Sequence, residues 1–281
     1  MKKKVIGVTM APAARQFGNA YEGHVFFGSQ GLGRQINPVA QVDHVPPAGQ
    51  QLAGGSTDAQ ALRGCEIVTL VTRGSVEARD SAGNRVQLQQ GDAQWLTAGS
   101  GLLRSETVQG AEPVELTHVL VNLPAQFKMT PPHSQHLASA AIPQVTLPEG
   151  AGTLRVIAGE YEGQLGPAET VGPVQLWTMD LRQGHSATVP LPTGWYAVVL
   201  VLDGRLEASY WPHPVTDRQL VVIDRVGDEV LLTAWEDTRL ILVSAEPLNE
   251  EVAGEDGLIL NTAEELAQAR LDLEAGQFGA L

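Results

Sequence analysis

Two short patterns occur twice in this chain, in the same order and with similar gaps. Residues 70–78 read LVTRGSVEA and residues 200–208 read LVLDGRLEA. Further along each half, residues 91–98 read GDAQWLTA and residues 227–234 read GDEVLLTA. Self-similarity of this kind indicates a duplicated domain. The 281 residues are enough for two domains that each bury a core, and we expect function to reside where the two copies differ.

Short segments rich in β-branched residues fill both halves of the chain, and the 30 Gly and 17 Pro are spread between them as turn signals. This pattern is typical of all-β sandwiches and barrels. We expect an N-terminal barrel over residues 1–130, a linker over 131–150 and a C-terminal barrel over 151–250. The predicted strands are 5–10, 66–72, 75–79, 85–88, 93–96, 102–107 and 114–122 in the first half, and 154–159, 174–181, 185–189, 196–202, 205–210, 219–224, 229–233 and 239–245 in the second.

The last part of the chain, residues 251–281, predicts a helical tail. Thr262 and Glu265 have the spacing of a capping box, and Gly276 is a natural stop for a helix. Leucine and alanine recur between them at helical spacing, so we expect one amphipathic helix that packs against a barrel.

Composition indicates which partners and which cellular compartment to expect for the chain. A formal charge of −14 argues against direct binding to nucleic acid, because a phosphate backbone repels an acidic surface. Cys65 is the single cysteine, which excludes an internal disulfide and favours a reducing compartment, so we expect a cytoplasmic protein. No segment approaches the ~20 apolar residues of a membrane span, and we expect no membrane partner.

Several longer motifs are distinctive. Residues 79–101 read RDSAGNRVQLQQGDAQWLTAGSG and are followed by LLRSE, and residues 121–137 read VNLPAQFKMTPPHSQHL. These motifs resemble the pirin family, a branch of the cupin superfamily. Residues 154–167 and the C-terminal tail resemble further family segments, so the likeness covers nearly the whole chain from about Gly23. The resemblance implies a bicupin, with two jelly-roll β-barrels and a C-terminal helix outside them.

The resemblance also implies a metal, usually iron, in the N-terminal barrel. Its ligands come from a His-x-His pair ahead of Arg-Gly-x-Glu and from a His-Ser-Glu in the second motif. In this chain the four positions hold Gln60, Leu62, Arg104 and Glu106. Leu62 has no donor atom, and a guanidinium does not release a proton to bind a metal. We therefore expect no cofactor, although family members use iron or another divalent transition metal.

The four residues are still expected to point into the barrel, because residues two apart on a strand share a face. Arg104 needs a carboxylate partner, for which Glu106 and Glu66 are the candidates. Two interpretations stay open: Arg104 neutralises Glu106 and plugs the cavity, or it binds a small organic anion. Trp95 is a further candidate for the pocket wall.

Three functions compete. The first is a monomeric, metal-free, pirin-like protein that binds a small molecule or a protein partner in regulation. The second is an oxidoreductase of the quercetin 2,3-dioxygenase type, which the resemblance links to a metal in the N-terminal barrel. The third is metal-independent catalysis with Glu106 as general acid or base and Arg104 as electrostatic stabiliser. Whether the chain is an enzyme stays open at this point.

Overall fold

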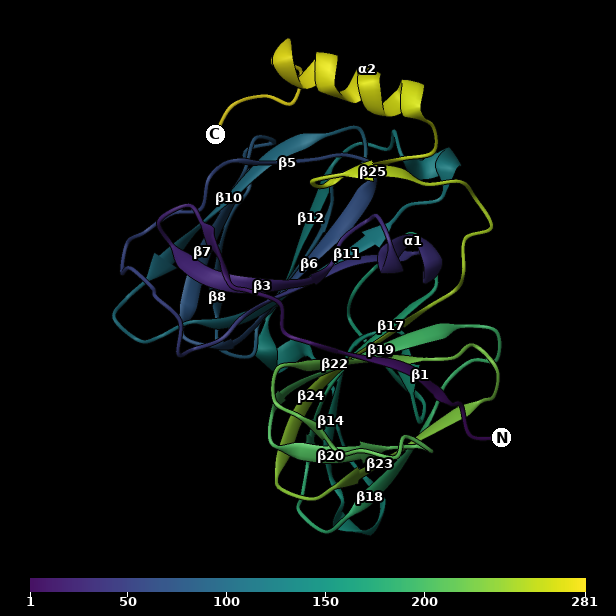
Figure 1. Ribbon diagram of the computed structural model, residues 1–281. Coiled ribbons are helices and arrows are strands. Elements are labelled where there is room, and N and C mark those ends of the chain that lie inside the picture. The colour runs from purple at the N-terminus through teal and green to yellow at the C-terminus, as the bar shows by residue number, and fades with distance from the viewer. The chain divides into compact units, whose positions relative to one another are not determined.

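The computed structural model describes residues 1–281 and is built almost entirely from antiparallel strands (Figure 1). The chain divides into two compact units. One contains residues 12–139 and 248–281, and the other contains residues 1–11 and 140–247. Each unit holds a seven-stranded and a four-stranded sheet, as expected for two cupin barrels.

The N-terminal barrel lies in the first of these units. Its larger sheet has the order β12 (His133–Leu137), β9 (Ala93–Thr97), β6 (Cys65–Arg73), β11 (Glu115–Asn122), β4 (Val39–Val45), β3 (Tyr21–Phe27) and β2 (Arg15–Phe17). Its smaller sheet has the order β5 (Gln60–Leu62), β10 (Leu102–Gln109), β7 (Ser75–Asp80) and β8 (Arg85–Gln89). A one-turn helix, α1 (Leu32–Gln35), connects β3 to β4.

The C-terminal barrel repeats this plan. Its larger sheet has the order β1 (Val5–Met10), β22 (Gln219–Ile223), β19 (Tyr196–Asp203), β24 (Thr238–Ala245), β17 (Val174–Leu181), β14 (Gly152–Ala158) and β13 (Gln144–Thr146). Its smaller sheet has the order β18 (Ser186–Pro190), β23 (Glu229–Ala234), β20 (Arg205–Ala208) and β21 (Val215–Thr216). The hairpin β15 (Glu160–Tyr161) and β16 (Gln164–Leu165) and the 3-10 turns at Ala125–Phe127, Ser139–Ala141 and Pro148–Gly150 complete the connections.

The two ends of the chain depart from the predicted domain limits. The first strand, β1, was placed in the N-terminal barrel but pairs with β22 of the C-terminal barrel. The tail, by contrast, belongs to the N-terminal unit. The predicted linker also contributes β12, which pairs with β9. All three differences arise from pairings between segments far apart in the chain, which local sequence patterns do not encode.

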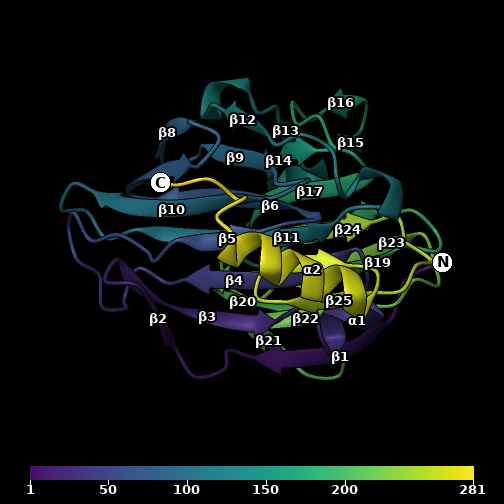
Figure 2. The ribbon, with the colours of Figure 1, turned by 90° about the horizontal axis from the view of Figure 1, so that it is seen from above.

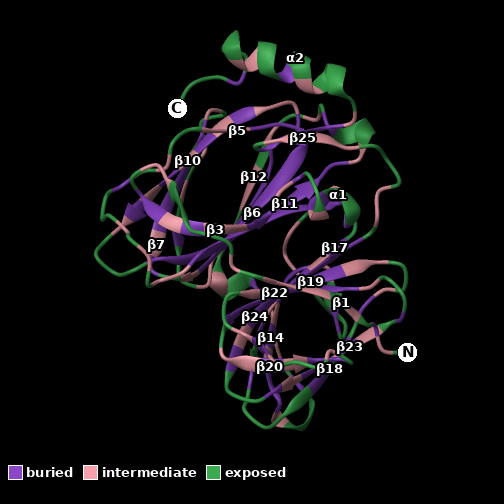
Figure 3. Ribbon diagram, viewed as in Figure 1, coloured by how far each residue is buried: buried purple, intermediate pink, exposed green.

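The C-terminal segment packs on the N-terminal barrel. The hairpin β25 (Ala253–Glu255) and β26 (Leu258–Leu260) leads into α2 (Ala263–Glu274), and Figure 2 shows α2 lying over β5. The predicted capping box is confirmed: the Thr262 hydroxyl accepts from Glu265 N, and the Glu265 carboxylate accepts from the backbone of Thr262. Most of α2 is exposed and Ala269 is its one buried residue (Figure 3). Neither helix of the protein has the length and apolar character that a membrane crossing requires.

The interiors of the two barrels differ. The C-terminal barrel is filled by one continuous cluster of buried apolar side chains. The N-terminal barrel has two smaller apolar clusters, and polar residues separate them along the strands. On β11, for example, Leu116 belongs to one cluster and Leu120 to the other, with His118 between them. The expectation that the two copies differ in chemistry therefore directs attention to the N-terminal barrel.

Candidate functional site

A cavity of about 720 Å³ lies in the N-terminal barrel. Strands β2, β3, β4, β5, β10 and β11 line it, and the C-terminal segment adds Arg270 and Leu273 of α2 to its wall. The polar residues of this wall include Tyr21, Asp43, Gln60, Arg104, Glu106 and His118.

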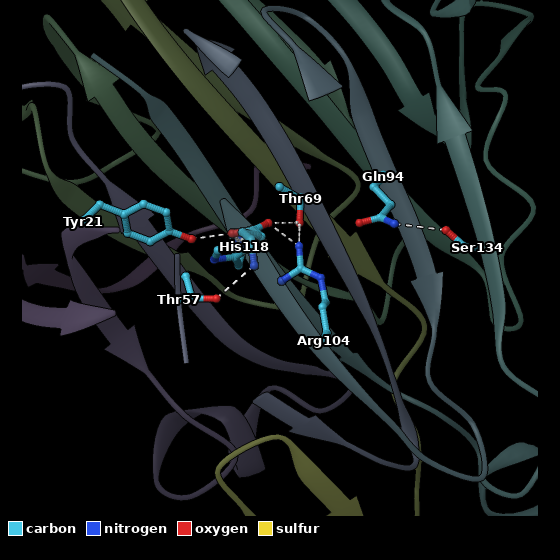
Figure 4. Close-up of polar contacts among 8 residues, drawn as sticks. Tyr21, Thr57, Thr69, Gln94, Arg104, His118 and Ser134 are labelled. Carbon is cyan, nitrogen blue, oxygen red and sulfur yellow. Dashed lines mark hydrogen bonds and ion pairs between the residues drawn. The ribbon is translucent and has the colours of Figure 1, made fainter. Parts of the chain in front are cut away.

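Glu106 is the centre of a buried hydrogen-bond network, and Figure 4 labels its partners Tyr21, Thr69, Arg104 and His118. It accepts hydrogen bonds from the Tyr21 hydroxyl and from Arg104 Nη2, and Thr69 Oγ1 donates to it over 3.2 Å. His118 Nε2 lies 3.0 Å from Glu106 Oε2. Burial alone would raise the pKa of Glu106, but the charge of Arg104 and then that of His118 hold it well below its ordinary value. Glu106 is therefore a fixed carboxylate with both oxygens engaged.

The same network acts in the opposite direction on Tyr21. Burial, followed by the neighbouring charge of Glu106, raises the pKa of the Tyr21 hydroxyl well above 10. Tyr21 therefore stays protonated and serves as a hydrogen-bond donor.

Asp43 is the second buried carboxyl of the cavity, with 3% of its surface exposed. It lies on β4 directly opposite His118 on β11. Gln41 Nε2 donates to Asp43 Oδ2 over 2.8 Å, whereas Oδ1 has no hydrogen-bond partner. Burial raises the pKa of Asp43 to about 6, and His118, Gln41 and Arg15 oppose that rise. A carboxylate that titrates so close to neutral pH, with an unpaired oxygen, is suited to accept a proton from a bound molecule.

The four residues at the positions implied by the resemblance do not all reach the cavity. Gln60, Arg104 and Glu106 line it, and Arg104 on β10 pairs directly with Gln60 on β5. Leu62 is fully buried in an apolar cluster instead. The motif glycine next to them, Gly64, has a φ of +71°, and a Cβ there would lie 2.1 Å from Ile259 O of β26. A glycine is required at this point because β26 packs so closely against it.

The two residues proposed as pocket support do not line the cavity. Glu66 is buried on β6 and accepts a hydrogen bond from Thr97 Oγ1 over 2.9 Å. Trp95 is fully buried on β9, away from the cavity wall. Of the two partners considered for Arg104, the structure brings Glu106 into contact with it.

Sequence reasoning missed Tyr21, Asp43 and His118. Asp43 and His118 lie in segments rich in Val and Leu, residues 39–45 and 115–122. A carboxylate or imidazole inside such a strand is a signal that could have identified them, because buried charges need a reason. Tyr21 carries no comparable signal.

Comparisons with known proteins agree with this fold. Residues 25–121 match the family described as Pirin, and residues 176–279 match the Pirin C-terminal cupin domain. Pirin of Mus musculus is 32% identical over 77% of this chain and 76% of its own length. The chain belongs to the pirin family. A Pseudomonas aeruginosa protein provisionally named quercetin 2,3-dioxygenase is 36% identical, over 98% of both chains.

Solved structures give the same picture. A quercetin 2,3-dioxygenase from Acinetobacter baumannii superposes with a TM-score of 0.94 at 31% identity, covering 100% of this chain and 99% of its own. A bacterial pirin from Escherichia coli, solved in complex with nickel(II), has a TM-score of 0.63 at 16% identity, over 86% of this chain and 99% of its own. The predicted all-β bicupin fold and pirin resemblance are confirmed.

The expectation of no cofactor is wrong in the light of these relatives. Two of them are named as quercetin 2,3-dioxygenases, the activity that the resemblance links to a metal in the N-terminal barrel. The residues at the four implied positions nevertheless do not fit a metal. Leu62 faces the core. Glu106 is the one residue that matches an expected ligand, and the guanidinium of Arg104 lies against its carboxylate. No group of three or more His, Cys, Asp or Glu residues in the chain is arranged to hold a metal ion. Family membership thus implies a metal in the N-terminal barrel, whereas the residues at these four positions do not fit one.

Proposed function

We propose that the N-terminal barrel is the active site of an oxidoreductase of the quercetin 2,3-dioxygenase type. Its substrate would be a small phenolic compound that carries a hydroxyl group beside a carbonyl group. The observation that carries this proposal is Asp43, a buried carboxyl of the cavity wall that has a pKa of about 6 and one oxygen without a hydrogen-bond partner. Relatives that bear the name quercetin 2,3-dioxygenase, at 36% and 31% identity, support it.

The size and lining of the cavity suit such a substrate. A volume of about 720 Å³ falls within the roughly 300–1,000 Å³ of pockets that enclose small organic molecules. Phe17 and Leu273 supply apolar surface for aromatic rings, and buried polar groups face the same space. A few polar groups in a partly apolar pocket fix the orientation of a ligand.

The chemistry begins with a proton transfer. The O–H bond of the substrate hydroxyl breaks, its electron pair stays on the substrate oxygen, and the proton moves to the carboxylate of Asp43. A base is most effective when its pKa lies near the working pH, and a value of about 6 meets this condition. The resulting electron-rich anion is the species that dioxygen, the oxidant of a dioxygenase, then oxidises.

The test combines binding and turnover. Quercetin binding to the purified protein is followed by absorbance, and oxygen uptake is followed with an electrode, on the protein as isolated and after addition of Fe²⁺, Ni²⁺, Cu²⁺ or Mn²⁺. Elemental analysis of the same preparation records which metal it carries. We expect the native protein to bind quercetin and to take up oxygen. In Asp43→Asn the rate of oxygen uptake should fall by roughly 10²- to 10⁴-fold, the usual contribution of a general base.

The matched control is Asp180→Asn, which changes an exposed aspartate on β17 of the other barrel. It should leave oxygen uptake unchanged. Quercetin that binds but is never consumed, with any of the metals, would point to a small-molecule-binding role in place of an enzyme. No binding at all, or full activity in Asp43→Asn, would refute the proposal.

The monomeric state, the cytoplasmic location and a protein partner remain predictions.

A further inference from the structure

Arg104 is a buried cation with unused hydrogen-bonding capacity in the cavity wall. Its side chain is 4% exposed and lines the cavity from β10. Nη2 is the nitrogen that has partners, Thr69 Oγ1 and Glu106 Oε1, while Nε has none (Figure 4). A guanidinium offers five donors, and because Nε is shielded from solvent, Nη1 is the nitrogen left for an acceptor in the cavity. A buried charged donor without an acceptor binds an incoming oxygen atom more strongly than a solvated one does.

The surrounding charges allow that oxygen to be anionic. Glu106 balances the charge of Arg104, and Asp43 adds a second carboxyl on the β4 side of the cavity. When a substrate proton moves to Asp43, the negative charge leaves Asp43 and appears on the substrate oxygen. The total charge around Arg104 and Asp43 does not change, so the transfer avoids the cost of creating a net charge beside buried groups.

The other two arginines of the cavity wall are placed differently. Arg270 is half-exposed and forms an ion pair with Glu255. Arg15 is exposed and lies over the Phe17 ring, 4.9 Å from its centroid. Arg104 is thus the buried arginine of this cavity.

Resting on the proposed function, we infer that Arg104 binds the deprotonated oxygen of the substrate. Its guanidinium supplies positive charge at a position where the family resemblance implies a metal ligand. The ligand class is the enolate or phenolate of a hydroxy-ketone, whose hydroxyl faces Asp43 before the proton leaves. Preorganised positive charge at a developing oxyanion is among the strongest contributions that an active site makes.

The test uses the absorption spectrum of bound quercetin, because a phenolate absorbs at longer wavelength than its neutral phenol. The native protein should bind quercetin near pH 7 with a red-shifted band, before any metal is added. Arg104→Gln should lose this band and bind quercetin at least 10-fold more weakly. Arg104→Lys, which keeps the charge but not the fork of donors, should retain part of the band.

Controls separate charge removal from loss of structure. Arg104→Gln leaves Glu106 buried without its cation, so the double variant Arg104→Gln/Glu106→Gln restores the charge balance and should also lose the band. Arg205→Gln is the matched control, since Arg205 has an Nε without a hydrogen-bond partner but belongs to the other barrel. Thermal unfolding of each variant records that it is folded.

The outcomes distinguish the inference from the proposed function. If the native protein does not bind quercetin, the proposed function fails. If the native protein binds quercetin and Arg104→Gln keeps both the band and the affinity, the inference about Arg104 fails alone. A band that appears in the native protein only after Ni²⁺ or Fe²⁺ is added would assign the anion to the metal and overturn the inference as well.

Discussion

Asp43→Asn should make the protein more stable at pH 8 while it removes the proposed base. Burial raises the pKa of Asp43 from 3.8 to about 6, so its ionised form is disfavoured in the folded state. At about 1.4 kcal/mol per pH unit, ionised Asp43 costs the folded protein about 3 kcal/mol above pH 6. The hydrogen bond from Gln41 is already included in this value, because it is one of the contacts that hold the pKa down to about 6. The net expectation is therefore about 3 kcal/mol of added stability.

The size of the effect depends on pH in a defined window. Because the pKa is raised in the folded state, the native protein binds a proton more tightly than the unfolded chain does, and stability from this group falls as pH rises from about 4 through 6. The advantage of Asp43→Asn should therefore be full at pH 8, smaller at pH 6 and absent near pH 4. The charged and titratable groups that face Asp43 are His118 of β11, Arg15 of β2 and Tyr21 of β3, and they are the same in both proteins.

Urea unfolding of the native protein and of Asp43→Asn at pH 8, 6 and 4 measures this difference. Hydrogen–deuterium exchange of peptides from β4 and β11 assigns the transition to the N-terminal barrel. In thermal unfolding at pH 8 the expected rise in Tm is roughly 6–12 °C, at about 2–4 °C per kcal/mol. A variant that is less stable than the native protein at pH 8, or a difference that does not change with pH, would contradict the reasoning. Asp180→Asn, at an exposed site, should show no such pH dependence.

Three further predictions concern the structure around the cavity. Cys65 should resist thiol reagents until the protein is denatured, because burial raises the pKa of its thiol to about 12; a native-state titration with a chromogenic disulfide checks this. Lys128→Met should lower the free energy of unfolding by about 2–4 kcal/mol, since the variant removes three hydrogen bonds that the ammonium of Lys128 donates to buried oxygen acceptors; urea unfolding measures it. Arg63→Ala should loosen the C-terminal helix, because Arg63 pairs with Asp272 at 2.6 Å and lies over the Phe278 ring at 4.4 Å; faster proteolysis of the tail, at an unchanged rate elsewhere, is the expected result.

Local sequence patterns were sufficient for the elements and for the plan of the fold. The two copies of the first repeated pattern, at residues 70–78 and 200–208, begin in β6 and β19. These two strands occupy corresponding places in the two larger sheets. The strand at Val5–Met10 and the helix capped by Thr262 are present as predicted. Both depend on neighbours in the chain, namely alternation along a strand and a side chain that reaches three residues ahead.

The site depended on pairings that local patterns do not contain. Tyr21 and Glu106 are 85 residues apart, and their contact requires β3 and β10 to face the same space. The resemblance directed attention to four positions of one motif pair and so identified Arg104 and Glu106. It gave no indication of Asp43, because this residue acts from β4, a strand outside both motifs.

One row of paired residues across the larger sheet explains why the N-terminal barrel has a polar interior. His118 of β11 pairs with Thr69 of β6 on one side and with Asp43 of β4 on the other. All three residues are buried, and two of them line the cavity. A hydroxyl, an imidazole and a carboxyl therefore lie side by side where a barrel core is usually apolar.

The corresponding row of the C-terminal barrel is apolar throughout. Thr69 directly precedes the first copy of the repeated pattern, as Val199 precedes the second. Val199 pairs with Leu242, and Leu242 pairs with Trp177. These three side chains are fully buried members of the continuous apolar core. The same fold is thus stable with an apolar row, and a polar row costs free energy through desolvation. Binding or proton transfer best explains why the N-terminal barrel keeps a polar row that costs free energy. For this reason we assign function to the N-terminal barrel and a structural role to the interior of the C-terminal barrel.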